Sequence, residues 1–382
     1  MASGPAVAID VTPLAGTLTG IGRSVVELLR ALALLDEPPV MVPYAVSTRA
    51  RRERAELPEH TAIVPGAKAL ARMWARGDRP SIDRALRDAT VLHATNYLVP
   101  PSRLPTLVTL NDCALVRHAS LCTPHVQSLA PVIRRAVARG AHIHVPSRFV
   151  AREVEEIFGP GLDAAGRIHV IPWGAPALAA SPAVPAELAR FGQVANGAPF
   201  VVALGTIEPR KNLPHLVAAF ASVAVEHRDL HLVLAGPDGP ARPEVDARLV
   251  RLRPEIRERV MLTGAVSEPA KSWLLHNAAM VAYPSVYEGF GFPVLEAMAA
   301  GVPVVAARAG SIPEIAGDAT ELVEPTDEDA MARAITRLLV DRERRDELVR
   351  RGRTRVSEFS WHSTATAVAR LYRELAAELV RG

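Results

Sequence analysis

The chain is organised around residues 283–314, which read YPSVYEGFGFPVLEAMAAGVPVVAARAGSIPE. Glu288 lies in this stretch within a glycine-flanked turn, EGFG. The pattern predicts a short helix over 294–300, because the proline before it suits a first helical turn and Gly301 suits a helix end. The apolar run 302–306 has the length and composition of a buried strand. A turn, a helix and a strand are therefore expected in succession.

A glycine-rich turn that leads into a helix is suited to bind an anion. Its backbone N–H groups have no partners within the helix, and the helix dipole adds positive charge at the same end. Two carboxylates flank this turn and helix start, Glu288 before the helix and Glu296 within it. A carboxylate cannot bind the anion, but it accepts hydrogen bonds from hydroxyl groups joined to that anion. Phosphate together with hydroxyls indicates a nucleotide sugar; the alternative is two ordinary solvated glutamates.

Glu288 and Glu296 are separated by seven residues, and in this they resemble the paired-glutamate motif of retaining glycosyltransferases. The surrounding sequence is similar to the large group 1, or family four, glycosyltransferases, which include bacterial mannosyltransferases, glucosyltransferases and sucrose synthases. The similarity is strong over residues 200–325 and weaker but continuous over the first half. It implies the GT-B fold, an α/β architecture of two facing Rossmann-like domains with doubly wound parallel sheets and a cleft between them.

The resemblance also implies roles for residues of the second half. Glu288 would bind hydroxyls of the transferred sugar, and Glu296 those of the ribose. Backbone groups after the strand predicted over 260–262 would contact the nucleotide base, which places Gly264 and Val266 in the donor site. Backbone N–H groups of the glycine turn would contact the phosphates, namely those of Gly289, Phe290 and Gly291.

A second phosphate signal lies earlier in the chain. A strand predicted over 200–204 is followed by GTIEPRKN and by a helical pattern over 213–226. Arg210 and Lys211 suit a diphosphate, since arginine offers a fork of donors and lysine a point charge. The segment resembles the phosphate-binding loop of the family, with Thr206 where some members carry another basic residue; solvated surface charges are the alternative. Lysine is rare in this chain, which contains only Lys68, Lys211 and Lys271.

The first half begins like a doubly wound sheet. An apolar run over 7–11 precedes the loop GTLTGIGR at 16–23 and a helical pattern over 24–35, an order typical of a parallel α/β fold. The loop resembles the glycine loop that the family places near the donor phosphates and the acceptor. Gly20 and Gly22 would let the backbone approach a ligand closely; a simple strand-to-helix turn is the alternative.

The strand predicted over 106–110 is followed by Asn111 and Asp112. In the family this strand end commonly carries a His-Asp pair, with the histidine near the transferred sugar, and the resemblance gives both residues a catalytic place. Asn111 departs from that pattern: an amide can donate or accept a hydrogen bond but cannot carry a proton. Either activity is lost, or the donor sugar has different hydroxyls.

Composition limits the remaining possibilities. The two cysteines are too few for a disulfide scaffold, which favours a reduced, cytoplasmic chain. No stretch approaches the ~20 apolar residues of a membrane span, and the start lacks the pattern of a secretory signal. The net charge is +3, and no nucleic acid partner is expected. The basic run at 49–54 and the amphipathic segment 67–76 can meet an anionic membrane at its inner face, or else be solvated and packed on their own domain.

A length of 382 residues is more than one core usually holds, so two domains are predicted. We expect an acceptor-side domain over 1–178, a Pro- and Ala-rich linker over 179–198, a nucleotide-sugar domain over 199–360 and a last helix over 361–382 that crosses back. The acidic run at 327–329 precedes a helical pattern and is expected to offset its dipole, so no metal site is expected.

The predicted activity is retaining, metal-independent transfer of a hexose from a nucleotide sugar to a saccharide, lipid-linked or small-molecule acceptor, without a cofactor. GDP-mannose is the first expectation, because residues 205–212 are most similar to mannosyltransferases; a UDP- or dTDP-sugar is the alternative donor. A non-catalytic scaffold that binds nucleotide sugars is a further alternative, motivated by Asn111. An epimerase or phosphorylase and a nicotinamide oxidoreductase are rivals; the oxidoreductase leaves the glutamate pair unexplained.

Overall fold

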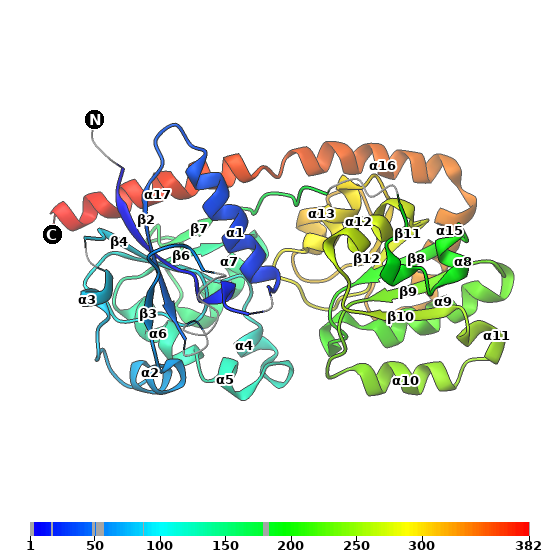
Figure 1. Ribbon diagram of the computed structural model, residues 1–382, viewed down its shortest axis with the longest axis horizontal. Helices are drawn as coiled ribbons and strands as arrows, with labels where there is room; N and C mark the ends of the chain where they lie inside the picture. Colours follow the sequence, from blue (N-terminus) through cyan, green and yellow to red (C-terminus); the bar gives the residue numbers. More distant parts are fainter. Residues whose placement is uncertain are drawn as a thin grey trace. The chain divides into compact units, whose positions relative to one another are not determined.

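The computed structural model describes residues 4–16, 18–47, 50, 57–86, 88–178 and 183–381. The chain divides into two compact units (Figure 1). The first unit comprises Met1–Gly174 and Ser360–Gly382, and the second comprises Ala175–Phe359. The basic run over 49–54 lies outside the described residues, apart from Ala50.

The first unit is built on a seven-stranded parallel sheet in the order β3-β2-β1-β4-β5-β6-β7. The order reverses beside β1, and ligands of doubly wound folds bind at the carboxyl ends of the strands near such a point. The strands are β1 (Ala6–Asp10), β2 (Val40–Val46), β3 (Ala62–Val64), β4 (Val91–Ala94), β5 (Thr106–Thr109), β6 (His142–Val145) and β7 (Ile168–Val170).

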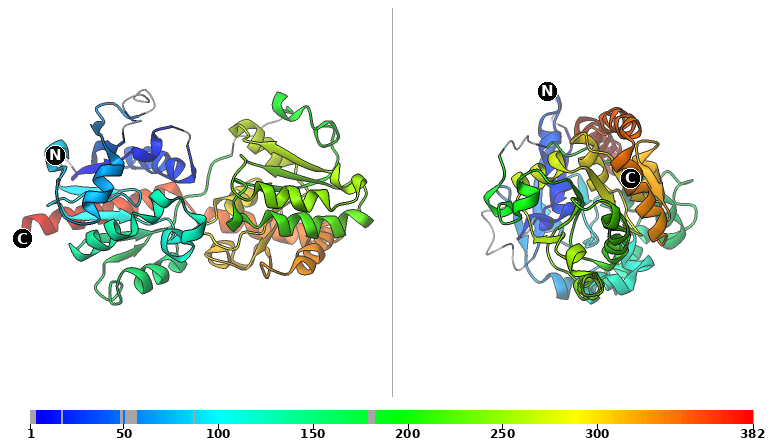
Figure 2. Two further views of the ribbon diagram at one scale, coloured as in Figure 1. Left: turned by 90° about the horizontal axis from the view of Figure 1, so that it is seen from below. Right: turned by 90° about the vertical axis from the view of Figure 1, so that its right-hand side faces the viewer.

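Helices cover both faces of this sheet (Figures 1 and 2). The main ones are α1 (Gly20–Ala33), α2 (Ala67–Trp74), α6 (Ala130–Ala138), α7 (Arg148–Phe158) and α17 (Trp361–Arg381). Shorter turns complete the unit: η1 (Thr12–Leu14), α3 (Asp83–Leu86), α4 (Ala114–Arg117), η4 (Ala119–Leu121) and α5 (Pro124–Gln127). The side chain of Ser147 accepts from Val150 N and so caps α7.

The amphipathic helix α2 uses its apolar face within its own unit. Trp74 and Ala71 are buried in the core, and Trp74 Nε1 donates to Pro80 O at 2.9 Å. Met73 is the one large apolar side chain of α2 that is exposed. Of the two alternatives given for segment 67–76, packing on its own domain is the one that these contacts show. No helix in the described ranges is both long and apolar enough to cross a membrane.

A line of buried hydrogen bonds runs across the sheet of the first unit. Tyr372 Oη lies 2.6 Å from His93 Nδ1, and His93 Nε2 lies 2.7 Å from Thr109 Oγ1. Thr109 Oγ1 lies 2.9 Å from His144 Nδ1, and His144 Nε2 lies 2.9 Å from Ile171 O. All four side chains are buried, so every member needs a partner.

With both imidazoles neutral, only one proton arrangement satisfies this line. The Ile171 carbonyl can only accept, so His144 Nε2 carries its proton and His144 Nδ1 accepts from the Thr109 hydroxyl. Thr109 then accepts from His93 Nε2–H, and His93 Nδ1 accepts from Tyr372. Burial keeps both imidazoles neutral, because it lowers the pKa of His93 to about 3 and that of His144 to about 4.

A neutral buried histidine makes stability depend on pH. Between pH 6.5 and the folded-state pKa, the unfolded chain binds protons that the folded chain does not, so stability falls as pH falls. Over this range each imidazole lowers the free energy of unfolding by about 1.4 kcal/mol for every unit by which the pH falls. Stability from this source is complete above pH 6.5 and is lost progressively below it.

We expect His93→Gln to flatten this dependence, because glutamine can accept from Tyr372 and donate to Thr109 without titrating. The slope of unfolding free energy against pH should fall by about 1.4 kcal/mol per unit, measured by urea denaturation between about pH 5 and 6.5. His125→Gln, at an exposed position of α5, is the control. An unchanged slope in His93→Gln would show that the native ring takes up protons like an exposed one.

The second unit holds a six-stranded parallel sheet in the order β10-β9-β8-β11-β12-β13. Its order reverses at β8, so the carboxyl ends of β8 and β11 flank the point where a ligand is expected. The strands are β8 (Phe200–Leu204), β9 (His231–Ala235), β10 (Val260–Gly264), β11 (Met280–Tyr283), β12 (Val304–Ala307) and β13 (Glu321–Val323). These strands are mostly buried, because helices cover both faces.

The helices of the second unit begin with η5 (Ala186–Leu188), α8 (Gly192–Ala195), η6 (Pro209–Lys211), α9 (Leu213–Glu226), α10 (Arg242–Val250), α11 (Pro254–Arg257) and α12 (Glu268–Asn277). They continue with α13 (Phe292–Ala299), α14 (Ile312–Ala316), α15 (Glu328–Val340) and α16 (Arg342–Ser357). Asp327 Oδ1 accepts from Ala330 N at 2.7 Å and caps α15, so the acidic run begins a helix as expected. No group of metal-binding side chains was found among the described residues.

The segment expected to be a linker, 179–198, is more structured than its composition indicates. It contains η5 and α8, and it belongs with the second unit. Leu188 and Val194 are buried, and the Gln193 side chain bonds to His231 on β9. A few buried contacts therefore hold two short helices within a stretch whose proline and alanine content predicted none.

Candidate active site

Three charged side chains meet at the carboxyl ends of β8 and β11. Lys211 ends η6, which follows β8, and Glu288 lies between β11 and α13. Glu288 Oε1 lies 2.7 Å from Lys211 Nζ and 2.8 Å from Arg210 Nη1. Lys211 Nζ also lies 2.8 Å from the Tyr283 hydroxyl. The structure thus brings together, within the second unit, two segments that are distant in the chain.

The environment of Glu288 keeps its carboxylate charged. Burial alone would raise its pKa, but the charges of Lys211 and Arg210 outweigh burial and lower the pKa of Glu288 to about 2. At neutral pH this group can therefore accept hydrogen bonds but cannot take up a proton. It is suited to hold hydroxyl groups or to stabilise positive charge, and it is unsuited to be a general base.

The two cations predicted to face a diphosphate are already paired with acids. Arg210 Nε lies 2.8 Å from Glu208 Oε2, in addition to the Glu288 contact. Lys211 is buried, whereas the side chain of Arg210 keeps 27% of its surface exposed. Arg210 is therefore the more accessible of the two to an anion. The sequence pattern did not reveal that both cations share one carboxylate.

The backbone around Glu288 depends on a glycine from another loop. Gly310 has φ +58°, and a Cβ there would lie 2.5 Å from Glu288 O and 2.7 Å from Glu288 N. Both the N–H and the hydroxyl of Ser311 donate to Glu288 O at 3.0 Å. Val286 N donates to Arg210 O at 2.8 Å and ties the two charged loops together. The position of the carboxylate therefore rests on contacts from two other loops, that of Gly310 and Ser311 and that of Arg210.

Glu296, the second glutamate of the predicted pair, has its own buried lysine. Glu296 Oε1 lies 2.7 Å from Lys271 Nζ on α12, and Lys271 Nζ also lies 2.9 Å from Glu268 Oε2. Glu296 and Lys271 are both buried, so each glutamate of the pair has one of the rare lysines as its partner. Sequence reasoning missed Lys271; the rarity of lysine was the signal that could have found it.

Other predicted residues of the second unit lie as follows. Gly291 has φ +99° and precedes α13, so the turn expected before this helix is present. The ring of Phe290 is buried against Phe292 and Phe359, with centroids 5.1 and 5.8 Å away, so only its backbone can serve a ligand. The carbonyl of Gly264 already accepts from Gly236 N at 3.0 Å, and Val266 follows β10 and is half-buried.

Asn111 and Asp112 lie in the first unit, after β5. Trp173 Nε1 donates to Asn111 Oδ1 at 3.0 Å. Asp112 Oδ1 accepts from the Tyr97 hydroxyl at 2.6 Å and from Ala114 N at 3.0 Å, at the start of α4. Trp173 and Tyr97 were not predicted, because no sequence pattern links them to this strand end.

The second half of the predicted glycine loop of the first unit is helix. Gly20 and Gly22 lie in the first turn of α1, where Thr19 Oγ1 accepts from Gly22 N, and the expected start at residue 24 was too late. A Cβ on Gly22 would lie 2.6 Å from Pro13 O, so this glycine is required by a contact within the unit. At Gly20 a Cβ would meet no atom within 4 Å.

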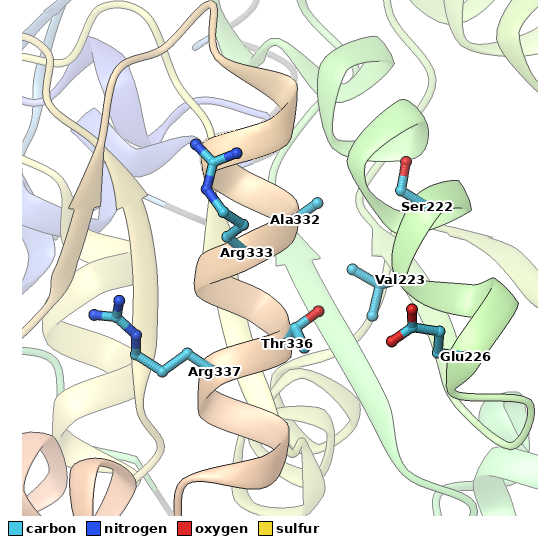
Figure 3. A pocket seen from close by; sticks show the side chains of 7 residues that line it. All are labelled: Ser222, Val223, Glu226, Ala332, Arg333, Thr336 and Arg337. Atoms are coloured by element: carbon cyan, nitrogen blue, oxygen red, sulfur yellow. The ribbon is translucent and has the colours of Figure 1, made fainter.

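A shallow hollow elsewhere on the second unit lies between α9 and α15 (Figure 3). None of the predicted site residues lines it. Its lining residues are Ser222, Val223, Glu226, Ala332, Arg333, Thr336 and Arg337. It offers few buried polar groups and is not the candidate active site.

Comparison with known proteins identifies the class. Residues 186–355 match the family model described as glycosyl transferases group 1. O-antigen chain mannosyltransferase B of Escherichia coli is 32% identical over 178 residues, covering 46% of each chain. The MMP alpha-(1->4)-mannosyltransferase of Mycolicibacterium hassiacum is 34% identical over 221 residues, covering 56% of this chain and 50% of that protein. The chain thus spans about half the length of the curated relatives it matches.

A solved structure of sucrose-phosphate synthase from Thermosynechococcus elongatus superposes with a TM-score of 0.73 at 21% identity, covering 98% of this chain and 100% of that one. Together with the two parallel-sheet units, this defines the GT-B fold. Residues 186–355, within the second unit, carry the group 1 glycosyltransferase domain. The fold class and the family expected from the paired glutamates are confirmed.

We expect Gly310→Ala to disturb the candidate site through the backbone of Glu288. Alanine at φ +58° is strained, and its Cβ would meet Glu288 backbone atoms. The variant should lose more than about 1 kcal/mol of stability, seen as a lower Tm in calorimetry. Gly192→Ala is the matched control, because a Cβ there meets nothing within 4 Å. A Tm for Gly310→Ala equal to that of the control would contradict the proposed dependence.

Proposed function

We propose that this chain is a glycosyltransferase that moves a hexose from a nucleotide sugar to a saccharide, lipid-linked or small-molecule acceptor. The observation that carries the proposal is the buried contact of Glu288 with Lys211 and Arg210 at the carboxyl ends of β8 and β11. Cations for a diphosphate and a carboxylate for hydroxyls are the two groups that such a donor requires. Family membership supports the same reaction class.

Cleavage of a sugar–phosphate bond places negative charge on the leaving diphosphate. Preorganised donors can meet that charge without reorganising during the reaction. Arg210 would contact the diphosphate first, because it is the more exposed cation, and the N–H groups at the start of α13 would add further donors. As a diphosphate draws Arg210 and Lys211, the carboxylate of Glu288 becomes available to hydroxyls of the transferred sugar.

Glu296 is proposed to bind the ribose. Lys271 holds Glu296 Oε1, and no described residue donates to Oε2. A carboxylate fixed by one oxygen can present the other to a diol at a defined angle. The lysine thus orients the carboxylate that would bind the ribose of the nucleotide.

Retention is proposed from the family resemblance, and the low pKa of Glu288 supports it. A carboxylate with a pKa of about 2 cannot accept the proton of the acceptor hydroxyl at neutral pH. In the proposed step the acceptor oxygen bonds to the anomeric carbon, the bond to the phosphate oxygen breaks, and that departing oxygen takes the acceptor's proton. No cofactor or metal ion is needed for this balance.

The donor is proposed to be GDP-mannose, because both relatives described above are named mannosyltransferases. A UDP- or dTDP-sugar is the alternative, since the predicted base contacts are made by backbone groups around Gly264. A second candidate function is a subunit that binds a nucleotide sugar without transferring it, and Asn111 at the predicted histidine position favours it. Turnover separates these two candidates, while binding does not.

A thermal-shift screen with nucleoside diphosphates and sugar nucleotides should identify the donor, because a ligand that binds the folded state raises Tm. Donor consumption with and without candidate acceptors then separates transfer from binding. A raised Tm with GDP-mannose, followed by transfer, is the expected result. Binding without turnover on any acceptor would favour the non-catalytic subunit.

We expect Arg210→Gln to lower kcat by about 10²–10³, the loss typical of removing one charge-stabilising donor. Glu288 keeps Lys211 as a partner in this variant, so folding should be retained. Arg333→Gln on α15, with its side chain 69% exposed, is the matched control. Turnover of Arg210→Gln equal to that of the control would exclude Arg210 from the diphosphate site.

A chelator should leave the rate unchanged, because protein donors supply the positive charge in the proposed step. Turnover is compared with and without EDTA at saturating donor. Inhibition by EDTA that added Mg²⁺ reverses would overturn the metal-independent mechanism.

A further inference from the structure

The ammonium group of Lys211 has more donors than partners. It carries three N–H groups and no acceptor. One N–H donates to Glu288 Oε1 at 2.7 Å, and another donates to the Tyr283 hydroxyl at 2.8 Å. Among the described residues, no further acceptor lies within hydrogen-bond distance of Nζ. Because only 10% of this side chain is exposed, the remaining N–H needs an acceptor that a bound ligand can supply.

The stem of Lys211 lies against the ends of two strands. Gly205, directly after β8, has φ +130°, and a Cβ there would lie 3.2 Å from Lys211 Cε. Tyr283 is the last residue of β11, and Lys211 Nζ lies 4.7 Å from the centroid of its ring. The lack of a side chain at residue 205 therefore lets the lysine lie along the strand end, where its ammonium reaches Tyr283.

Tyr283 is a rigid and neutral partner for this lysine. It is 1% exposed and pairs with Ala306 of β12 in the parallel sheet. Burial raises the pKa of Tyr283 well above its ordinary value, and the charge of Glu288 raises it further, so the phenol keeps its proton. An ammonium can only donate, so the Tyr283 oxygen accepts from Lys211. The phenol's own hydrogen bond with Glu288 is one of the interactions that outweigh burial and lower the pKa of that carboxylate.

A diphosphate would affect the two partners of Lys211 differently. Glu288 and a diphosphate are both anions, so they compete for the lysine and repel each other. The phenol of Tyr283 is neutral and fixed at a strand end, so it keeps its hydrogen bond while the ammonium turns toward the ligand. Lys211 then retains one fixed acceptor and directs its other N–H groups at phosphate oxygens.

We propose that Tyr283 is a positioning residue that holds the Lys211 ammonium against the diphosphate of the donor through its neutral hydroxyl. This rests on the proposed function and deepens it. Both residues lie in the second unit, at the end of β11 and in η6. An ammonium held in this way meets the charge of the departing diphosphate without first being reoriented. The hydroxyl should therefore matter more for kcat than for KM.

The first test is Tyr283→Phe, which removes the hydroxyl and keeps the ring. We expect kcat to fall about tenfold, the loss typical of one hydrogen bond to a charged group, while KM for the donor changes by less than about twofold. Tyr44→Phe is the matched control, because Tyr44 is also fully buried but its hydroxyl has no hydrogen-bond partner within the described ranges. Equal kcat in the two variants would overturn the role of Tyr283.

A second readout needs no turnover and uses the rarity of lysine. Side-chain labelling with ¹³C gives lysine signals from only three residues, Lys68, Lys211 and Lys271. The signal that is lost in Lys211→Gln belongs to Lys211, and Glu288 keeps Arg210 as a partner in that variant. Addition of GDP, UDP or dTDP, whichever raises Tm, should shift the Lys211 signal in the wild type. The signal of Lys68, in the first unit, is the internal control and should not move.

The pH titration of the Lys211 signal measures the hydrogen bond with Tyr283. Burial lowers the pKa of Lys211, the charge of Glu288 opposes this, and that of Arg210 adds to it. Glu208 is the other charged group that acts on the ammonium, and it also favours the charged form. Tyr283→Phe removes an acceptor that favours the charged form, so the pKa of Lys211 should lie about one pH unit lower than in the wild type. Because the ammonium acts in its charged form, kcat of the variant should also decline at a lower pH on the alkaline side.

The two readouts separate the positioning role from the proposed function. A pKa of Lys211 that is the same in Tyr283→Phe and in the wild type would overturn the positioning role while the transferase function stands. A Lys211 signal that none of the three nucleoside diphosphates shifts would overturn the diphosphate contact of the proposed function. The pKa comparison would then still decide whether Tyr283 holds the ammonium. A lower pKa together with a lower kcat is the result expected.

Discussion

The carboxylate of Glu288, held between Lys211 and Arg210, is the interaction on which the candidate site depends. It exists because β8 and β11 are neighbours at the reversal of strand order, which brings their following loops together. Removal of either charge type would leave a buried ion without its partner, which is costly in a protein interior. The same pairing keeps Glu288 ionised at every physiological pH, so its chemistry is that of an acceptor.

The two units use different means to place their polar groups. The second unit pairs each glutamate of the motif with a buried lysine, Lys211 for Glu288 and Lys271 for Glu296. The first unit uses neutral groups, with hydrogen bonds that run in one direction from Tyr372 to the Ile171 carbonyl. Charged partners shift the pKa values of the glutamates, whereas hydrogen bonds between neutral groups fix the orientation of side chains. The indole of Trp173, next to the buried hydrogen bonds of the first unit, orients Asn111 through such a hydrogen bond.

Much of the site could be predicted because its residues are adjacent in sequence to turns and helix starts. Glu288 beside a glycine turn, and Arg210 with Lys211 before a helix, are local patterns with a local physical meaning. Lys271, Gly310 and Trp173 were not predicted. Each acts on a residue from a different loop or strand, and such pairing follows from strand order. The two short helices within 179–198 were not predicted for the same reason, since Gln193 of α8 contacts His231 on the distant strand β9.

The sequence by itself determined the α/β class, the paired glutamates and the family, because periodicity, turn residues and motif spacing are properties of the chain. Only the tertiary structure decided that Arg210 and Lys211 share one carboxylate, that Phe290 is a core residue and that Gly22 serves a contact within its own unit. It also decided that the amide oxygen of Asn111 accepts a hydrogen bond from Trp173. The partners and the orientation of a site side chain depend on which distant segments the sheets bring within hydrogen-bond distance. That distance cannot be inferred from the residues that neighbour the side chain in sequence.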